Sequence, residues 1–426
     1  MKLKRLLLIG VTILMLADFV GRGVFEAWSA EKNDFSDPYC GAWLWRHAQN
    51  PYDVALATTT DISLAGSHVK IVPVYPLTTY VLTAPLSLVP WHVANVVWAI
   101  LGTAGVAVIG LSLVRLLGCT AETDVFWLVV GFVFAFAPFH TAVHVANVAV
   151  ICLALCVWAV YLASTGKEIA AGVALAVSIG LKPQLGFWIL LFYLLQRRWR
   201  LFVTVALIGI VLLGIALVRV PMPVASIFRS YAENLHYWFG PGEQNDFTAA
   251  NPLRFQLINA QVVLYPLVRT VLRANVLSWA LWLSGSAVWF WVFLRADGES
   301  GTLALTSLLA LSLIPFYHRS YDLGVLVFAL CWCLSEDREC LKRPARVTFL
   351  LLLVLLLPGQ SVILRTQLSL PGWVNSSWWW NVMVAPYAVW TLLALNLVLL
   401  HALLRAGRSP RKKADHDGLA VGNVPG

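Results

Sequence analysis

Long apolar runs separated by short polar segments dominate this sequence. A transmembrane helix needs about 17–25 mostly apolar residues, and twelve runs reach or approach that length. They lie near residues 6–20, 92–114, 124–138, 145–163, 169–181, 184–195, 201–218, 275–294, 303–315, 321–334, 347–364 and 381–404. The pattern predicts an all-α, polytopic integral membrane protein with about twelve transmembrane helices.

Basic residues between the runs predict how the helices are oriented. Cytoplasmic loops of membrane proteins are enriched in Lys and Arg. If the basic residues within 2–5 are cytoplasmic and the helices alternate, the dense clusters at 197–200, 338–346 and 405–413 all fall on the same side. The sequence therefore predicts that both termini are cytoplasmic.

Three longer polar segments fall on the opposite, outer side, at residues 23–91, 220–273 and 365–380. No internal repeat divides the chain, so we expect residues 1–404 to form one transmembrane domain. Residues 405–426 are polar, basic and contain Gly and Pro. We expect them to form a disordered cytoplasmic tail.

Two adjacent runs, 169–181 and 184–195, are unusually short. At 1.5 Å per residue each covers only about 20 Å, which is less than the hydrocarbon core of about 30 Å. The turn Lys182-Pro183-Gln184 should therefore lie in the outer half of the bilayer, or in a cavity open to the outside. A lysine at that depth needs a partner or a polar cavity.

The composition supports a membrane protein. The chain is 60% hydrophobic and 12% charged, with a mean hydropathy of +0.77, whereas soluble domains carry about 25% charged residues. Much of the net charge of +9 lies in the short basic clusters that set orientation, so it does not indicate a nucleic-acid partner. The first run resembles a signal peptide without a clear cleavage site, so we expect it to remain as the first helix.

Acidic residues just after the first run are candidates for chemistry. Asp34 follows that run closely and should lie near the outer membrane surface. It is either a solvated loop carboxylate or helix cap, or a general base, which needs a carboxylate beside a substrate hydroxyl. Asp37 has the same alternatives and could cap a helix over residues 39–49.

Lys182 and the segment YHRSYD at 317–322 are cationic candidates on the same side. Lys182 either reaches the outer headgroups or binds a phosphate, which suits a compact point charge. The segment is either a polar turn with an Arg319–Asp322 pair, or it places His318 and Arg319 over the same cavity as Lys182.

A histidine pair is the remaining candidate. His140 and His144 are four residues apart, a spacing that suits metal ligands on a helix. A third ligand is not evident in the sequence, so we expect no metal.

Four motifs follow one another along the chain. The first combines Asp34-Phe35, Tyr39, Gly41-Ala42 and Pro51-Tyr52-Asp53. The second is YPLTTYVLTAPLSLVPW over residues 75–91, the third is AGVALAVSIGLKPQLGFWILLFYLLQRRWR over 171–200, and the fourth is His318. In order and spacing these motifs resemble glycosyltransferase family 87, the polyprenyl-phosphate-mannose-dependent α-mannosyltransferases with the GT-C fold.

The sequence departs from the family pattern at two places. Ala146-Asn147 stands where the family often has Gly-Gln, and residues 317–322 replace a Trp-x-His-Tyr type segment. These departures bear on the donor sugar and the acceptor more than on the fold.

The resemblance implies a GT-C-like enzyme of a bacterial-type inner membrane, with its active site facing outside. It would move a sugar, mannose in the family, from a polyprenyl-phosphate donor to a glycan or glycolipid acceptor. Asp34 would take the proton of the acceptor hydroxyl, and Lys182 with Arg319 would neutralise the leaving phosphate. A lipid-monophosphate donor lacks the diphosphate that usually calls for a metal, so no metal or cofactor is implied.

The same resemblance implies a set of substrate-binding residues. They are Asp37, Tyr39, Tyr52, Tyr75, Asn147 and His318. Whether Asp34 or Asp37 is the base stays open at this point.

A transporter or lipid flippase is the alternative function, because about twelve spans with both ends inside also suit that class. Transporters commonly show repeated halves and charges near the bilayer midplane. This sequence shows neither clearly, since its unusual polar residues gather on one side. A structural or assembly protein is a third possibility.

Overall fold

The computed structural model describes residues 2–25, 33–65, 70–295, 301–315, 317–356 and 369–407. Over these residues the secondary structure is helical, apart from one isolated bridge between Leu257 and Arg319. The predicted all-α class is confirmed.

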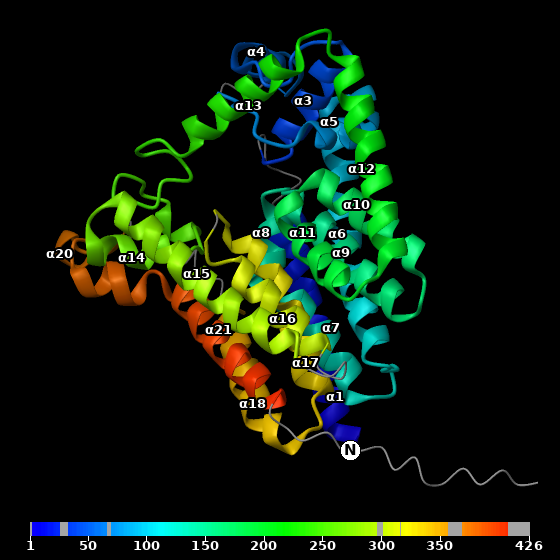
Figure 1. The fold of residues 1–426 in the computed structure, drawn as a ribbon, viewed down its shortest axis with the longest axis vertical. Coiled ribbons are helices and arrows are strands. Elements are labelled where there is room, and N and C mark those ends of the chain that lie inside the picture. The colour runs from blue at the N-terminus through cyan, green and yellow to red at the C-terminus, as the bar shows by residue number, and fades with distance from the viewer. Residues whose placement is uncertain are drawn as a thin grey trace, which may run out of the picture.

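Each of the twelve predicted apolar ranges overlaps a helix (Figure 1). These helices are α1 (Lys2–Asp18) with its π-helical extension η1 (Phe19–Phe25), α6 (Trp91–Leu116), α7 (Asp124–Ala135), α9 (Ala149–Ser164), α10 (Glu168–Leu181), α11 (Pro183–Leu195), α12 (Trp199–Arg219), α15 (Val271–Phe293), α16 (Gly301–Ser312), α17 (Val327–Ser335), α18 (Glu339–Val354) and α21 (Tyr387–Ala406).

Among the described residues, four helices are long and apolar enough to cross a membrane alone: α6, α12, α15 and α21. A fifth span is possible if α7 and α8 (Ala137–His144), which meet at a bend of 45°, count as one. The other apolar helices are shorter. The length and apolar composition of these helices thus indicate a membrane protein. The predicted number of about twelve spans stays a prediction.

The remaining helices lie largely in the predicted outer segments. They are α3 (Ser36–Arg46), α4 (Val54–Ala65), α5 (Leu77–Thr83), η2 (Ala84–Leu88), α13 (Val224–Trp238), η3 (Arg254–Gln256), α14 (Gln261–Val268), η5 (Ser320–Leu326), α20 (Gly372–Asn375) and η6 (Trp380–Val384). Figure 1 shows α3, α4, α5 and α13 gathered at the end of the molecule opposite the N terminus.

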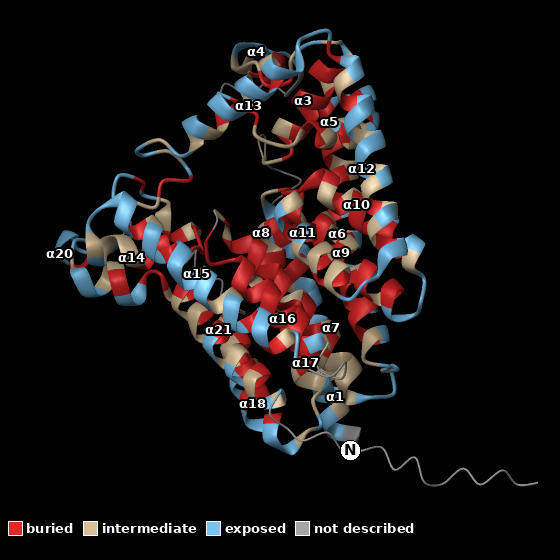
Figure 2. Cartoon of the chain, in the orientation of Figure 1, coloured by how far each residue is buried: buried red, intermediate tan, exposed pale blue. Residues whose placement is uncertain are grey.

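Burial separates a central group of helices from peripheral ones (Figure 2). Helix α16 is buried along most of its length, whereas only 17% of the apolar segment of α12 and of α15 is buried. An apolar helix with so little protein contact is suited to face lipid.

Ion pairs join segments that the sequence assigns to the same face. Lys4 Nζ lies 3.1 Å from Asp124 Oδ2, which links the start of α1 to the start of α7. Arg198 Nη1 lies 2.8 Å from Glu168 Oε1, which links the loop before α12 to the start of α10. In each pair, the two helix ends that are joined are predicted to lie on the same, cytoplasmic side of the membrane.

The short hairpin breaks where the sequence predicts. Lys182 separates α10 from α11 and has an extended backbone, with φ −153° and ψ 92°. A residue before proline is pushed out of the helical region, and Pro183 is well placed to begin the next helix. The side chain of Lys182 is thereby fixed at the tip of the hairpin.

Candidate active site

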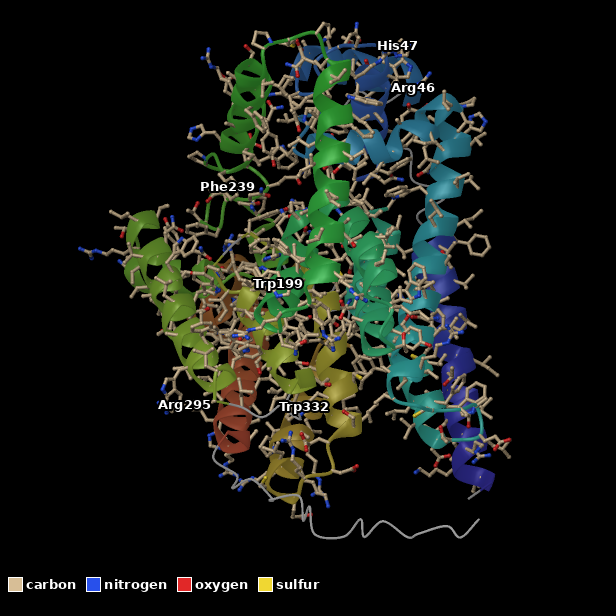
Figure 3. All side chains as sticks on the ribbon, turned by 45° about the vertical axis from the view of Figure 1, so that its right-hand side comes forward. Arg46, His47, Trp199, Phe239, Arg295 and Trp332 are labelled. Carbon is tan, nitrogen blue, oxygen red and sulfur yellow. The ribbon has the colours of Figure 1, made fainter. Side chains whose placement is uncertain are left out.

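A cavity of about 390 Å³ collects side chains from six separate parts of the chain. These parts are separated from one another along the sequence, and the fold brings them together. They are residues 33–37, 70–76, Asn147, 182–184, 231–245 and 317–321. Figure 3 places one lining residue, Phe239, between Arg46 at one end of the molecule and Arg295 toward the other.

Asp34 lies on the cavity wall with one carboxylate oxygen held and the other open. Its backbone N–H donates to the carbonyl of Val145 at 2.8 Å, and the Asn147 side-chain amide donates to its Oδ2 at 2.7 Å. Oδ1 has no hydrogen-bond partner in the part of the chain that the structure describes. The side chain is half-buried, so an oriented carboxylate oxygen remains for a substrate.

The break between α8 and α9 fixes Asn147 for this contact. Ala146 adopts a left-handed conformation with φ 51°, and its carbonyl accepts a hydrogen bond from the Trp98 indole at 2.9 Å. The Ala149 N–H donates to Asn147 Oδ1 at 2.9 Å, which directs the amide nitrogen toward Asp34. Asn147 is therefore suited to orient the carboxylate.

Asp37 lies three residues on but has both oxygens engaged. Val74 N–H donates to Oδ2 at 3.0 Å, and the Tyr80 hydroxyl donates to Oδ1 at 3.1 Å. The possibility that Asp37 caps a helix over 39–49 is wrong, because α3 begins at Ser36 and Asp37 lies within its first turn. These bonds tie α3 to α5 and to the segment before it, as a structural residue would.

Tyr75 stands beside the Asp34–Asn147 contact. The Asn147 amide donates to its hydroxyl at 3.3 Å. Burial first, and then the negative charges of Asp34 and Asp37, raise the pKa of Tyr75 well above its usual value. The phenol stays protonated, so it can donate a hydrogen bond toward the cavity.

Lys182 is buried and paired. Its Nζ donates to Asp322 Oδ1 at 2.5 Å and lies 4.6 Å above the Tyr321 ring. His318 Nδ1 lies 3.1 Å from the other oxygen, Asp322 Oδ2. An ammonium has three N–H donors, so pairing with Asp322 leaves donors for a ligand.

Within the described residues, the Arg319 guanidinium donates hydrogen bonds to neutral groups only. Its Nε donates to the Tyr317 hydroxyl at 2.7 Å, and its Nη2 donates to Gln244 Oε1 at 2.5 Å. The possible pair between the Arg319 and Asp322 side chains is wrong. Asp322 pairs with Lys182, and its contact with Arg319 is a hydrogen bond from the Arg319 backbone N–H. Among the described residues the guanidinium has no carboxylate in ion-pair contact, which leaves a cation for an anionic ligand.

Three expected site residues lie outside the cavity lining. The Tyr39 hydroxyl donates to the Val89 carbonyl at 2.8 Å. The Tyr52 hydroxyl donates to the Tyr75 carbonyl at 2.9 Å. His318 is 1% exposed and contacts Asp322. The structure thus brings six of the nine expected residues to the cavity wall: Asp34, Asp37, Tyr75, Asn147, Lys182 and Arg319.

Sequence reasoning missed the contribution of the second outer segment. Helix α13 and the loop after it supply Tyr231, Trp238, Gln244 and Asn245 to the cavity. A signal was present, because Tyr231 and Trp238 are seven residues apart, which places them on one helical face.

The histidine pair shows no metal arrangement. His140 Nε2 lies 2.5 Å from the Phe134 carbonyl, and its ring packs edge-on against Phe19. Within the described ranges, no group of three or more His, Cys, Asp or Glu residues is placed to hold a metal ion.

The fold and the cavity define an all-α membrane protein with a charged, partly enclosed site. The family model of glycosyltransferase family 87 matches residues 74–315, which is more than half of the chain. The chain therefore belongs to glycosyltransferase family 87 and is a glycosyltransferase. No curated protein and no solved structure matches it. The match includes Tyr75, Asn147 and Lys182, and it leaves out Asp34 and Arg319.

Proposed function

We propose that this glycosyltransferase moves a sugar, mannose in the first instance, from a polyprenyl-phosphate donor to a hydroxyl of a glycan or glycolipid acceptor. The reaction takes place at the outer face of a bacterial-type cell membrane. The observation that carries the proposal is that Asp34, with an open oxygen, shares one cavity with the cations Lys182 and Arg319. A base and a phosphate site in one cavity are what glycosyl transfer from a lipid phosphate needs.

Asp34 acts as the general base. The acceptor oxygen attacks the anomeric carbon of the donor while Asp34 Oδ1 takes its proton. The bond between the anomeric carbon and the phosphate oxygen breaks, and its electron pair stays with the polyprenyl phosphate. Asn147 holds the carboxylate through Oδ2, so Oδ1 is already aimed when the acceptor arrives.

Lys182 and Arg319 stabilise the phosphate as negative charge develops on it. Arg319 can offer its fork of N–H groups after exchanging the neutral Gln244 contact. Lys182 keeps Asp322 as its counterion. His318 and Tyr52 act behind the cavity wall, by fixing Asp322 and the Tyr75 backbone respectively. Asp37 and Tyr39 support α3, and Tyr75 offers its hydroxyl to the substrate.

Family membership supports transfer over the transporter or flippase alternative. The test is an assay with the purified protein in lipid nanodiscs, using radiolabelled decaprenyl-phosphate mannose and decaprenyl-phosphate glucose with octyl glycosides as acceptors. Transfer of label to the glycoside supports the proposal. Label that stays on the lipid with every acceptor, while an added nucleotide sugar supplies the glycoside instead, contradicts it. In sealed vesicles, movement of the labelled lipid across the bilayer without a new glycosidic bond would indicate a flippase.

A further inference from the structure

One corner of the cavity is built from Trp238, at the end of α13, and Asn245, in the loop that follows. Both line the cavity. The Asn245 backbone N–H donates to the Trp238 carbonyl at 3.0 Å, so the two residues are held together. Neither takes part in the base or phosphate chemistry described above.

Asn245 carries an unexplained buried polar atom. The residue is 7% exposed, and its Oδ1 is buried without a hydrogen-bond partner in the described part of the chain. Buried polar groups in native proteins are nearly always hydrogen-bonded, and an exception needs an explanation. Because Asn245 lines the cavity, rotation of its amide about the Cβ–Cγ bond would bring this oxygen to the cavity, where a ligand hydroxyl would satisfy it.

Trp238 offers a fixed aromatic surface beside that amide. Its indole N–H donates to the Val72 carbonyl at 2.9 Å, which fixes the plane of the ring. Helix α13 is itself held in place, because the Asn234 amide donates to the carbonyls of Tyr52 and Pro73, both at 2.9 Å. The ring is therefore oriented before any ligand binds.

The loop that carries Asn245 is equally well fixed. Asp246 accepts hydrogen bonds from Gly242 N–H at 2.7 Å, and from the N–H and hydroxyl of Thr248 at 2.8 and 2.7 Å. The Asn251 amide donates to the Asp246 carbonyl at 2.7 Å. These bonds fix the loop backbone on either side of Asn245, so the residue stays at the cavity wall, as a preorganised binding site requires.

We propose that Trp238 and Asn245 form a subsite for a sugar ring, in which the apolar face of the ring lies on Trp238 and a ring hydroxyl donates to Asn245 Oδ1. An aromatic surface combined with a few placed polar groups is typical of small-molecule sites. The inference rests on the proposed sugar transfer, and it names the residues that select the sugar. The sugar ring belongs either to the donor lipid or to the acceptor. In both cases Trp238 and Asn245 would make the same contacts with it.

Equilibrium binding tests the subsite without requiring catalysis. The full-length protein in nanodiscs is titrated with decaprenyl-phosphate mannose, with sugar-free decaprenyl phosphate, and with octyl α-mannoside, octyl β-glucoside and octyl β-galactoside. Asn245→Ala, Trp238→Ala and Trp238→Phe are compared with Phe228→Ala. Phe228 is also on α13 and is 52% exposed, but it does not line the cavity.

A donor-sugar subsite predicts that Asn245→Ala weakens the sugar-bearing lipid about three- to tenfold, the scale of one hydrogen bond, and leaves decaprenyl phosphate unchanged. An acceptor subsite predicts the same loss for one octyl glycoside and no loss for either lipid. In both cases Trp238→Phe retains more binding than Trp238→Ala, and Phe228→Ala binds like the unmodified chain.

Equal affinities in Asn245→Ala, Trp238→Ala and the unmodified chain would overturn the subsite, and Asn245 Oδ1 would then hold a water only. A normal unfolding temperature for each variant excludes misfolding as the cause of any loss. Because binding is measured, a protein that binds sugars here but transfers none would contradict the proposed function alone. A protein that transfers sugar with unaltered binding in these variants would contradict the subsite alone.

Discussion

At the cavity wall, Asp34 and Asp37 lie three residues apart but differ in what they contact. Asp37 receives the Val74 N–H and the Tyr80 hydroxyl on its two oxygens. Asp34 is held through one oxygen and leaves the other open. A general base needs a free lone pair directed at the substrate. The local geometry thus favours Asp34, a choice that the sequence leaves open.

Lys182 gives a prediction at the same scale. Lys182→Gln removes the charge that we propose binds the donor phosphate, so the apparent donor KM should rise or kcat should fall, by about tenfold or more. Lys182→Arg should be intermediate, because its planar fork keeps the charge but not the compact shape. Steady-state transfer rates measure both effects. Unchanged kinetics in Lys182→Gln would assign the lysine to structure.

Variants of the Lys182–Asp322 pair can distinguish an effect on donor binding from an effect on the stability of the protein. Asp322→Asn leaves a buried ammonium without its counterion, so it should destabilise the protein by about 3–5 kcal/mol. Lys182→Gln/Asp322→Asn removes both charges and should recover most of that stability without recovering donor binding. Thermal unfolding in detergent and donor KM give the two readouts. Recovery of both in the double variant would argue against a phosphate role for Lys182.

Residue types and spacing, together with the family resemblance, were enough to assemble most of the site from sequence. Asp34, Asn147, Lys182 and Arg319 do meet in one cavity. The partner of Lys182 was not predictable, because Asp322 reaches it across 140 positions of the chain. Such a pairing depends on how α10 and η5 pack, which no local pattern encodes.

At the scale of elements, the apolar pattern located helices but not their bends. The predicted run 124–138 is two helices, because the chain turns by 45° where α7 ends at Ala135 and α8 begins at Ala137. Pro138 lies in the first turn of α8, where proline begins a helix rather than continuing one. Helix α13 was missed because it lies in an outer segment without a long apolar run.

Gly41 provides a prediction for the contact between α3 and α5. A Cβ at Gly41 would lie 2.2 Å from the Tyr80 ring, whose hydroxyl holds Asp37. Gly41→Ala should therefore displace Tyr80 and lower the free energy of unfolding by about 1–3 kcal/mol. Gly209→Ala is the matched control, because nothing lies within 4 Å of a Cβ there. Equal unfolding temperatures for the two variants would contradict this packing.

At the scale of the whole molecule, function depends on which side of the membrane the cavity faces. The basic clusters predict an outer position for α13 and an inner position for the start of α18. Two chains that each keep a single cysteine can test this in intact cells. One introduces Glu233→Cys on exposed α13, and the other retains the native, exposed Cys340 of α18.

A membrane-impermeant maleimide added outside should label the Glu233→Cys chain and leave the Cys340 chain unlabelled until the cells are opened. This result follows from the positive-inside pattern. The reverse labelling pattern would place the cavity in the cytoplasm, where Asp34 could not meet an acceptor outside the cell.

The account depends most on Asp34 as the base of sugar transfer. The direct measurement is single-turnover transfer from labelled decaprenyl-phosphate mannose by Asp34→Asn, beside Asp37→Asn and the unmodified chain. We expect Asp34→Asn to unfold at the normal temperature, to bind the donor normally and to lose at least about 10²-fold in rate. Asp37→Asn should keep most of its rate in the molecules that remain folded. Near-normal transfer by Asp34→Asn, together with no transfer by folded Asp37→Asn, would contradict the account and assign the proton to Asp37.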